Sequence, residues 1–199
     1  QSKDAEYVAE LGADAIGLIF YSKSSRAVSA KLLPRILGDL AGSISVVALF
    51  VDPSKDEVNE VLDSGLVDLI QFHGNESEEF CSSFNKPYMK AFHIRDKALT
   101  SKAVNEYSSA KYLLLDTYNE KEPGGTGNVF DWTIADDIMA KTDQQIVLAG
   151  GLSPRNIEHA VRFVNPFGVD VSSGVELSPG KKDMTKLRNF VQRARRGRS

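Results

Sequence analysis

Short apolar runs alternate with helical segments along the whole chain, and this alternation limits the possible folds more than any other feature. The apolar runs have the length of buried strands, and they lie at residues 15–21, 45–51, 66–72, 88–94, 112–116, 146–151 and 167–173. Segments with helical character lie at 3–11, 30–40, around 58–62, and at 76–84, 97–107, 132–140, 155–163 and 183–193. This order predicts a parallel sheet whose strands are connected by crossover helices.

The number of strands bears on which parallel architecture forms. We count seven strands and eight helices, and the first element is a helix with no strand ahead of it. A (β/α)8 barrel closes with eight strands, so a barrel without its first strand accounts for both observations. An open doubly wound sheet also accommodates seven strands, but no Gly-x-Gly-x-x-Gly motif follows an early strand. We predict an α/β fold, a (β/α)8 TIM barrel with the first β-strand absent, forming a single domain over residues 1–199.

Composition argues against several classes of function. The chain is 42% hydrophobic and 26% charged, as in ordinary globular domains, and its formal charge of −3 gives no general attraction to nucleic acid. No apolar stretch approaches the roughly 20 residues that cross a bilayer, and we expect no signal segment. The single cysteine, Cys81, cannot form an intrachain disulfide. We expect a cytoplasmic protein, either monomer or homodimer, without nucleic-acid or membrane partners.

Asp116 is the first candidate for a catalytic residue. The apolar run 112–115 ends abruptly in this acid, and a long loop with three glycines between 124 and 127 follows it. Because ligands of parallel α/β folds bind outside the carboxyl ends of the strands, Asp116 is placed to transfer a proton beside a phosphate-binding loop. The alternative is that Asp116 caps the next helix, which is a common role for Asp after a strand.

Small residues also end the last two predicted strands. The segments are Leu148-Ala-Gly-Gly-Leu152 and Val169-Asp-Val-Ser-Ser-Gly-Val-Glu176, and their exposed backbone N–H groups could converge on one phosphate. Barrel enzymes commonly bind phosphate at the loops after strands seven and eight. We therefore expect bulk at Gly174 to weaken phosphate binding far more than stability. The alternative is that Gly150, Gly151 and Gly174 only form tight turns.

Two further strand ends carry polar groups. Arg26 lies just past the strand at 15–21, where its guanidinium could hold a substrate carboxylate or could be a surface cation on a loop. His73 follows the strand at 66–72 and could donate to a substrate oxygen or satisfy a backbone group at the rim. His93 and His159 lack ligand-like spacing, and no His/Cys/Asp cluster indicates a metal.

Seven segments together resemble phosphoribosylanthranilate isomerase over nearly the whole chain. They are Gly12-Ala-Asp-Ala-Ile-Gly17, Phe20-Tyr-Ser-Lys-Ser-Ser-Arg26, Gln71-Phe-His-Gly74, Leu114-Leu-Asp116, Gly124-Gly-Thr-Gly127 with Phe130-Asp-Trp132, and the two small-residue segments at 148–152 and 169–176. The resemblance implies a barrel enzyme of tryptophan biosynthesis. Its reaction is the Amadori rearrangement of N-(5-phosphoribosyl)anthranilate to the 1-deoxyribulose isomer, without metal or organic cofactor.

The resemblance also implies roles for individual residues. Asp116 is expected to protonate the furanose ring oxygen, and Arg26 to bind the anthranilate carboxylate. His73 and Asp170 are expected to contact the substrate. The phosphate is expected to lie against a further set of small residues, namely Gly125, Gly150, Gly151, Ser173 and Gly174.

The general base of this family is a cysteine in a Lys-Ile-Cys-Gly segment on the first strand, and residues 1–5 match the positions immediately after that segment. Cys81 is expected to be a packing residue on a helix, so residues 1–199 alone are expected to have little activity. Three origins remain open: roughly ten N-terminal residues missing, a deliberate truncation, or the C-terminal half of a fused enzyme. Two other functions also remain open, a phosphate-ligand-binding barrel that has lost its base and another sugar-phosphate isomerase or lyase.

Overall fold

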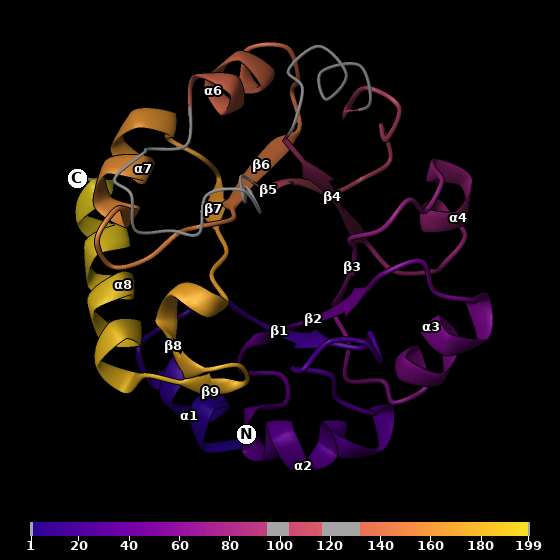
Figure 1. The fold of residues 1–199 in the computed structure, drawn as a ribbon. Helices are drawn as coiled ribbons and strands as arrows, with labels where there is room; N and C mark the ends of the chain where they lie inside the picture. Colours follow the sequence, from indigo (N-terminus) through magenta and orange to yellow (C-terminus); the bar gives the residue numbers. More distant parts are fainter. Residues whose placement is uncertain (1, 95–103, 117–131, 199) are drawn as a thin grey trace.

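Seven parallel strands form one curled sheet in the computed structural model, which describes residues 2–94, 104–116 and 132–198. The strands pair in chain order and are β1 (Ala15–Ile19), β2 (Ser45–Phe50), β3 (Leu69–Phe72), β4 (Tyr88–His93), β5 (Tyr112–Asp116), β6 (Gln145–Ala149) and β7 (Gly168–Val169). Figure 1 shows them curving around the centre with the helices outside. The predicted barrel-type α/β fold is confirmed, and β1 and β7 are the two edges of the sheet.

Helices separate the strands as the sequence predicts. They are α1 (Ser2–Glu10), α2 (Leu33–Leu37), α3 (Lys55–Leu62), α4 (Glu78–Ser82), α6 (Thr133–Met139), α7 (Ile157–Val164) and α8 (Met184–Gly197), and α2 lies between the 3-10 turns η1 (Ala30–Leu32) and η2 (Gly38–Leu40). Side chains fix several of the starts: Ser54 and Glu57 form a capping box at α3, and Asp183 caps α8. Most of the helix predicted at 97–107 lies outside the described residues. No described helix has the length and apolar character needed to cross a membrane.

The end of the chain departs from the prediction. The strand predicted at 167–173 is limited to β7, which is paired with β6 only at Gly168 and Val169. After it come the 3-10 turn η3 (Ser173–Val175) and an antiparallel hairpin of β8 (Glu176–Ser178) and β9 (Lys181–Lys182), which the sequence pattern did not predict. The Glu176 carboxylate accepts from Gly180 N at 3.3 Å and Lys182 Nζ at 3.2 Å, so it closes this hairpin.

The two faces of the sheet have separate apolar clusters. The larger lies between the sheet and the helices and includes Leu113 and Leu115, whereas the smaller lies inside the curl and includes Met89, Ala91 and Leu114. Successive strand residues point to opposite faces. An inward residue near the end of one strand therefore lies beside inward residues of its neighbours, and this arrangement positions the candidate site.

Candidate active site

Four side chains, two imidazoles and two carboxylates, lie at the carboxyl edge of the sheet, at or just after the ends of their strands. His73, His93 and Asp116 continue the inward alternation of Leu69, Met89 and Leu114, and Asp170 comes directly after β7. His93 and Asp116 are also register partners across β4 and β5. The curled sheet therefore gathers groups that are far apart in the sequence at the rim of its inner face.

Asp116 forms the centre of this group. Its Oδ2 lies 3.3 Å from His73 Nε2 and 3.8 Å from His93 Nδ1, and its side chain is 16% exposed. The strand end expected for Asp116 is confirmed, because β5 ends at this residue. The alternative role as a helix cap concerns residues from 117 onward, which lie outside the described part of the chain.

His73 is held from its other side by Gln71. Gln71 is buried, and its Nε2 lies 3.0 Å from His73 Nδ1, so amide, imidazole and carboxylate form one chain of contacts. With the amide nitrogen donating to Nδ1, the Nε2 atom of His73 carries the proton and donates to Asp116. This chain fixes the direction of the Asp116 carboxyl group.

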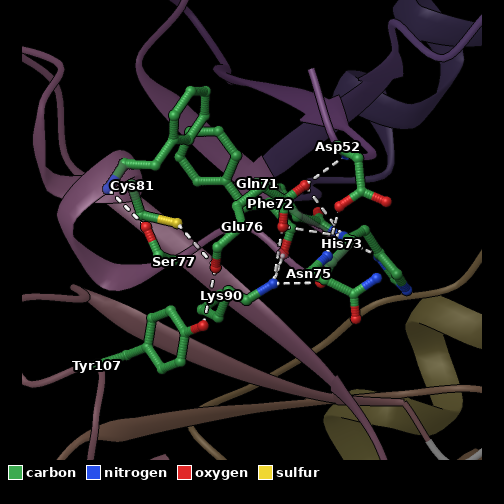
Figure 2. Close-up of polar contacts among 12 residues, drawn as sticks. Asp52, Gln71, Phe72, His73, Asn75, Glu76, Ser77, Cys81, Lys90 and Tyr107 are labelled. Atoms are coloured by element: carbon green, nitrogen blue, oxygen red, sulfur yellow. Dashed lines mark hydrogen bonds and ion pairs between the residues drawn. The ribbon is translucent and has the colours of Figure 1, made fainter. Parts of the chain in front are cut away.

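A buried ion pair supports the segment that carries His73 (Figure 2). Lys90 Nζ lies 2.8 Å from Glu76 Oε2 and donates to Gly74 O at 2.6 Å, and both charged side chains are at most 3% exposed. Glu76 also accepts from Asp52 N and Gly74 N. The pair thus joins β4 to the segments that follow β2 and β3, next to His73.

Asp170 lies near the group as a second acid. The residue is exposed, yet partial desolvation by neighbouring protein atoms raises the pKa of Asp170 above its usual value. Charge interactions with His73 and Lys182 act in the opposite direction, and the Asp116 charge adds to the rise. Asp170 therefore holds a proton more readily than an ordinary surface aspartate.

Arg26 is held by an acidic partner. Its Nη2 lies 2.6 Å from Glu176 Oε2, and its Nε contacts both carboxylate oxygens at 2.9 and 3.1 Å. Burial alone raises the pKa of Glu176, but the Arg26 hydrogen bond and the Lys182 charge outweigh it, so the pKa is lowered overall. Glu176 thus holds the guanidinium group of Arg26 in one orientation through Nε and Nη2, while Nη1 takes no part in the pair.

The loops after β6 and β7 meet as the glycine pattern suggested. Gly150 and Gly151 have φ angles of 80° and 62°, which favour glycine, and a Cβ on Gly151 would meet open space. A Cβ on Gly174 would lie 1.9 Å from Leu152 O, so this glycine is also needed for backbone packing between the loops. The expectation that bulk at Gly174 mainly weakens phosphate binding is therefore revised. Ser173 lies exposed beside Gly174, and Gly125 lies outside the described residues.

Comparison with known proteins gives the same family as the sequence motifs. The family model described as N-(5'phosphoribosyl)anthranilate (PRA) isomerase matches residues 1–193. The chain is 43% identical to the N-(5'-phosphoribosyl)anthranilate isomerase of Legionella pneumophila (strain Paris), over 96% of this chain and 91% of that protein. The chain belongs to the PRA isomerase family.

Two solved structures of PRA isomerases show the same fold. The enzyme from Thermotoga maritima superposes with a TM-score of 0.89 at 35% identity, covering 98% of this chain and 94% of that one. A PRA isomerase in complex with reduced 1-(o-carboxyphenylamino)-1-deoxyribulose 5-phosphate has a TM-score of 0.86 at 32% identity, with the same coverage of both chains. The curled sheet of this chain is thus the sheet of PRA isomerase barrels.

Sequence reasoning missed several partners in this PRA isomerase site. It predicted no His/Cys/Asp cluster, but ligand atoms of His73, His93 and Asp116 lie within 4.8 Å of one another. The alternation of side chains along β4 could have placed His93 in this group. His93 lies two positions after the inward Ala91, so it faces the same side of the sheet. Glu176 ends the small-residue segment 169–176, but its pairing with Arg26 across 150 positions carries no sequence signal.

Cys81 has the structural role that the sequence predicted. It lies in α4, is fully buried, and its Sγ is 3.9 Å from Glu76 O. Burial raises the pKa of the Cys81 thiol to about 12. A thiol with so little thiolate at neutral pH is a packing group and cannot act as the base of a PRA isomerase.

Proposed function

We propose that this protein is the isomerase that converts N-(5-phosphoribosyl)anthranilate to 1-(2-carboxyphenylamino)-1-deoxyribulose 5-phosphate by an Amadori rearrangement, in tryptophan biosynthesis. The observation that carries the proposal is Asp116 at the inner rim, with its Oδ2 3.3 Å from His73 Nε2. Membership in the PRA isomerase family supports the same reaction.

Asp116 is the proposed general acid. Its carboxyl proton passes to the furanose ring oxygen as the bond between that oxygen and sugar C1 breaks, and the lone pair of the anthranilate nitrogen forms the C1=N bond. His73, held at Nδ1 by Gln71, keeps the carboxyl group pointed across the rim. Catalysis by a positioned acid of this kind contributes about 10²–10⁴-fold to a rate.

The second proton transfer removes the hydrogen from sugar C2, and the C1=N electron pair returns to nitrogen as a C1=C2 double bond forms. The resulting enolamine becomes the ketone of the product when C1 takes up a proton and the C2 hydroxyl loses one. The buried Cys81 is excluded as the base by its burial and raised pKa. We propose that the base is the cysteine that the family carries on the strand next to β1.

Substrate binding is proposed for the remaining rim groups. The loops containing Gly150, Gly151, Ser173 and Gly174 offer backbone N–H groups to the phosphate, together with the loop around Gly125. Arg26 is proposed to bind the anthranilate carboxylate, and its pairing with Glu176 holds the guanidinium in place beforehand. Asp170, whose pKa is raised, is proposed to contact the sugar.

The experiment is a turnover assay on the full-length protein. Phosphoribosylanthranilate is supplied, and the decay of the fluorescence of the anthranilate adduct is followed. Catalytic decay is expected. Binding of the substrate in calorimetry without any turnover would instead favour a phosphate-binding barrel without catalysis, and turnover of pentose phosphates that lack anthranilate would favour another sugar-phosphate isomerase or lyase.

Several properties of the protein stay predictions alongside this function. We propose that the reaction needs neither a metal nor an organic cofactor, because proton transfers alone accomplish it. We propose a cytoplasmic location, a monomer or homodimer, and no nucleic-acid partner, in accordance with the charge of −3.

A further inference from the structure

We propose that His73, His93 and Asp116 form a binding site for a divalent transition-metal ion, of which Zn²⁺ is the best match, and that the ion inhibits the enzyme reversibly. The three ligand atoms lie within 4.8 Å of one another. The binding part of this proposal is independent of the proposed function, and only the inhibition rests on it.

The spacing of the atoms suits a tetrahedral ion. With Zn–N and Zn–O bonds of about 2.0–2.1 Å, two ligand atoms of one tetrahedral ion lie roughly 3.3–3.4 Å apart. The observed distances are 3.3 Å from His73 Nε2 to Asp116 Oδ2 and 3.8 Å from His93 Nδ1 to the same oxygen. Small side-chain shifts therefore bring all three atoms to bonding distance, and water can take the fourth position.

The chemistry of the ligands selects the class of metal. Two imidazoles and one carboxylate are ligands for Zn²⁺, Co²⁺, Ni²⁺ and Cu²⁺, whereas Mg²⁺ and Ca²⁺ prefer oxygen ligands. The half-exposed side chain of His93 opens the cluster to solvent, so an ion can enter. When Nε2 of His73 binds the ion, Nδ1 of His73 carries the proton. Turning the Gln71 amide then places its oxygen where it accepts from Nδ1–H, so Gln71 would hold the metal-binding orientation of His73.

Inhibition follows from the atoms that the ion occupies. The Asp116 carboxylate would be coordinated to the ion and would stay ionised, so it could not deliver a proton to the sugar ring oxygen. Histidines that hold a proton compete with the metal, so affinity is expected to fall as pH is lowered. A chelator that removes the ion should restore turnover.

The test measures metal binding without any turnover. Tag-free full-length protein is freed of metal with a chelator, and Zn²⁺ is titrated by calorimetry in a phosphate-free buffer, while Co²⁺ is followed by its visible absorption. The wild type is expected to show one saturable site for both ions and none for Mg²⁺. His93→Ala is expected to lose the site, and Gln71→Met to weaken it by about 10–100-fold.

His159→Ala is the matched control, because His159 is the remaining histidine of the chain and lies on α7 against Trp132. This variant should bind Zn²⁺ as the wild type does. Inhibition is then measured for each variant against its own metal-free rate, and His93→Ala should resist Zn²⁺ concentrations that stop the wild type. Absence of saturable binding in the wild type, or equal Zn²⁺ affinity in wild type and His93→Ala, would overturn the proposal.

Discussion

Glu176 fixes Arg26 across the open side of the sheet, with Arg26 Nη2 2.6 Å from Glu176 Oε2 and the Glu176 side chain only 4% exposed. The contact joins the loop after β1 to the hairpin after β7, so the two edges of the sheet are connected by side chains. This relationship leads to a prediction about stability and pH.

Glu176→Gln should lower the free energy of unfolding at neutral pH by about 1.5–3 kcal/mol, because a charge-assisted contact is lost. The pKa of Glu176 is lowered in the folded protein, so its stabilisation is present above the ordinary value of 4.5 and is lost as pH falls below it. Denaturant unfolding between pH 7 and pH 3 should therefore show a shallower loss of stability in the variant.

Glu158→Gln is the control for this prediction. Glu158 pairs with Arg162 one helical turn away at 2.9 Å, but the side chains are 34% and 61% exposed, against 4% for Glu176. Its removal should cost less than about 0.5 kcal/mol. Equal losses of unfolding free energy in the two variants would mean that the Arg26–Glu176 contact stabilises the protein no more than the Glu158–Arg162 pair does.

Lys90→Met should destabilise the protein by about 3–5 kcal/mol, because it leaves the Glu76 carboxylate buried without its cation. The double variant Lys90→Met/Glu76→Gln should recover much of this loss, since a neutral amide still accepts from the backbone of Asp52 and Gly74. Urea unfolding of both variants checks the coupling, and Lys141→Met, at an exposed position, serves as the control. Additive effects of the two changes would contradict a coupled pair.

Gly174→Ala should lower both the melting temperature and the affinity for a phosphorylated substrate. A Cβ at this position would lie 1.9 Å from Leu152 O, and the two loops would have to separate. Gly151→Ala is the comparison, because its Cβ meets open space and only the φ of 62° costs energy, about 1–2 kcal/mol. Thermal unfolding and KM measurements are made on both, and a Gly174→Ala protein as stable as the wild type would contradict the close approach.

Cys81 should resist thiol reagents in the folded protein. The thiol is fully buried and its pKa is raised to about 12, so almost no thiolate is available near pH 8. Its modification by an aromatic disulfide reagent should become fast only when a denaturant unfolds the chain. Rapid labelling of Cys81 under native conditions would show that α4 opens easily or that the thiol is accessible.

Much of the fold could be predicted from the local pattern. Each of the seven apolar runs overlaps a strand, and the run at 112–116 matches β5 at both ends. Apolar runs and glycines act locally, so a single sequence displays them. The hairpin of β8 and β9 was missed because its strands, Glu176–Ser178 and Lys181–Lys182, are too short to show an alternating apolar pattern.

The candidate site was only partly predictable from the sequence. Asp116 stood out because an acid ends an apolar strand. The contact of Asp116 with His93 depends on strand register, and the support of His73 by Gln71 depends on rotamers. The pair of Lys90 and Glu76 was hidden because burial of a charge appears only when the helices have packed on the sheet.

The proposed role of Asp116 as general acid is tested most directly by Asp116→Asn in the full-length protein. With phosphoribosylanthranilate as substrate, we expect kcat to fall by about 10²–10⁴-fold with a much smaller change in KM, because the amide keeps the shape but cannot deliver the proton. Asp143→Asn, at an exposed position before β6, should retain the wild-type rate. Wild-type turnover by Asp116→Asn would contradict the account.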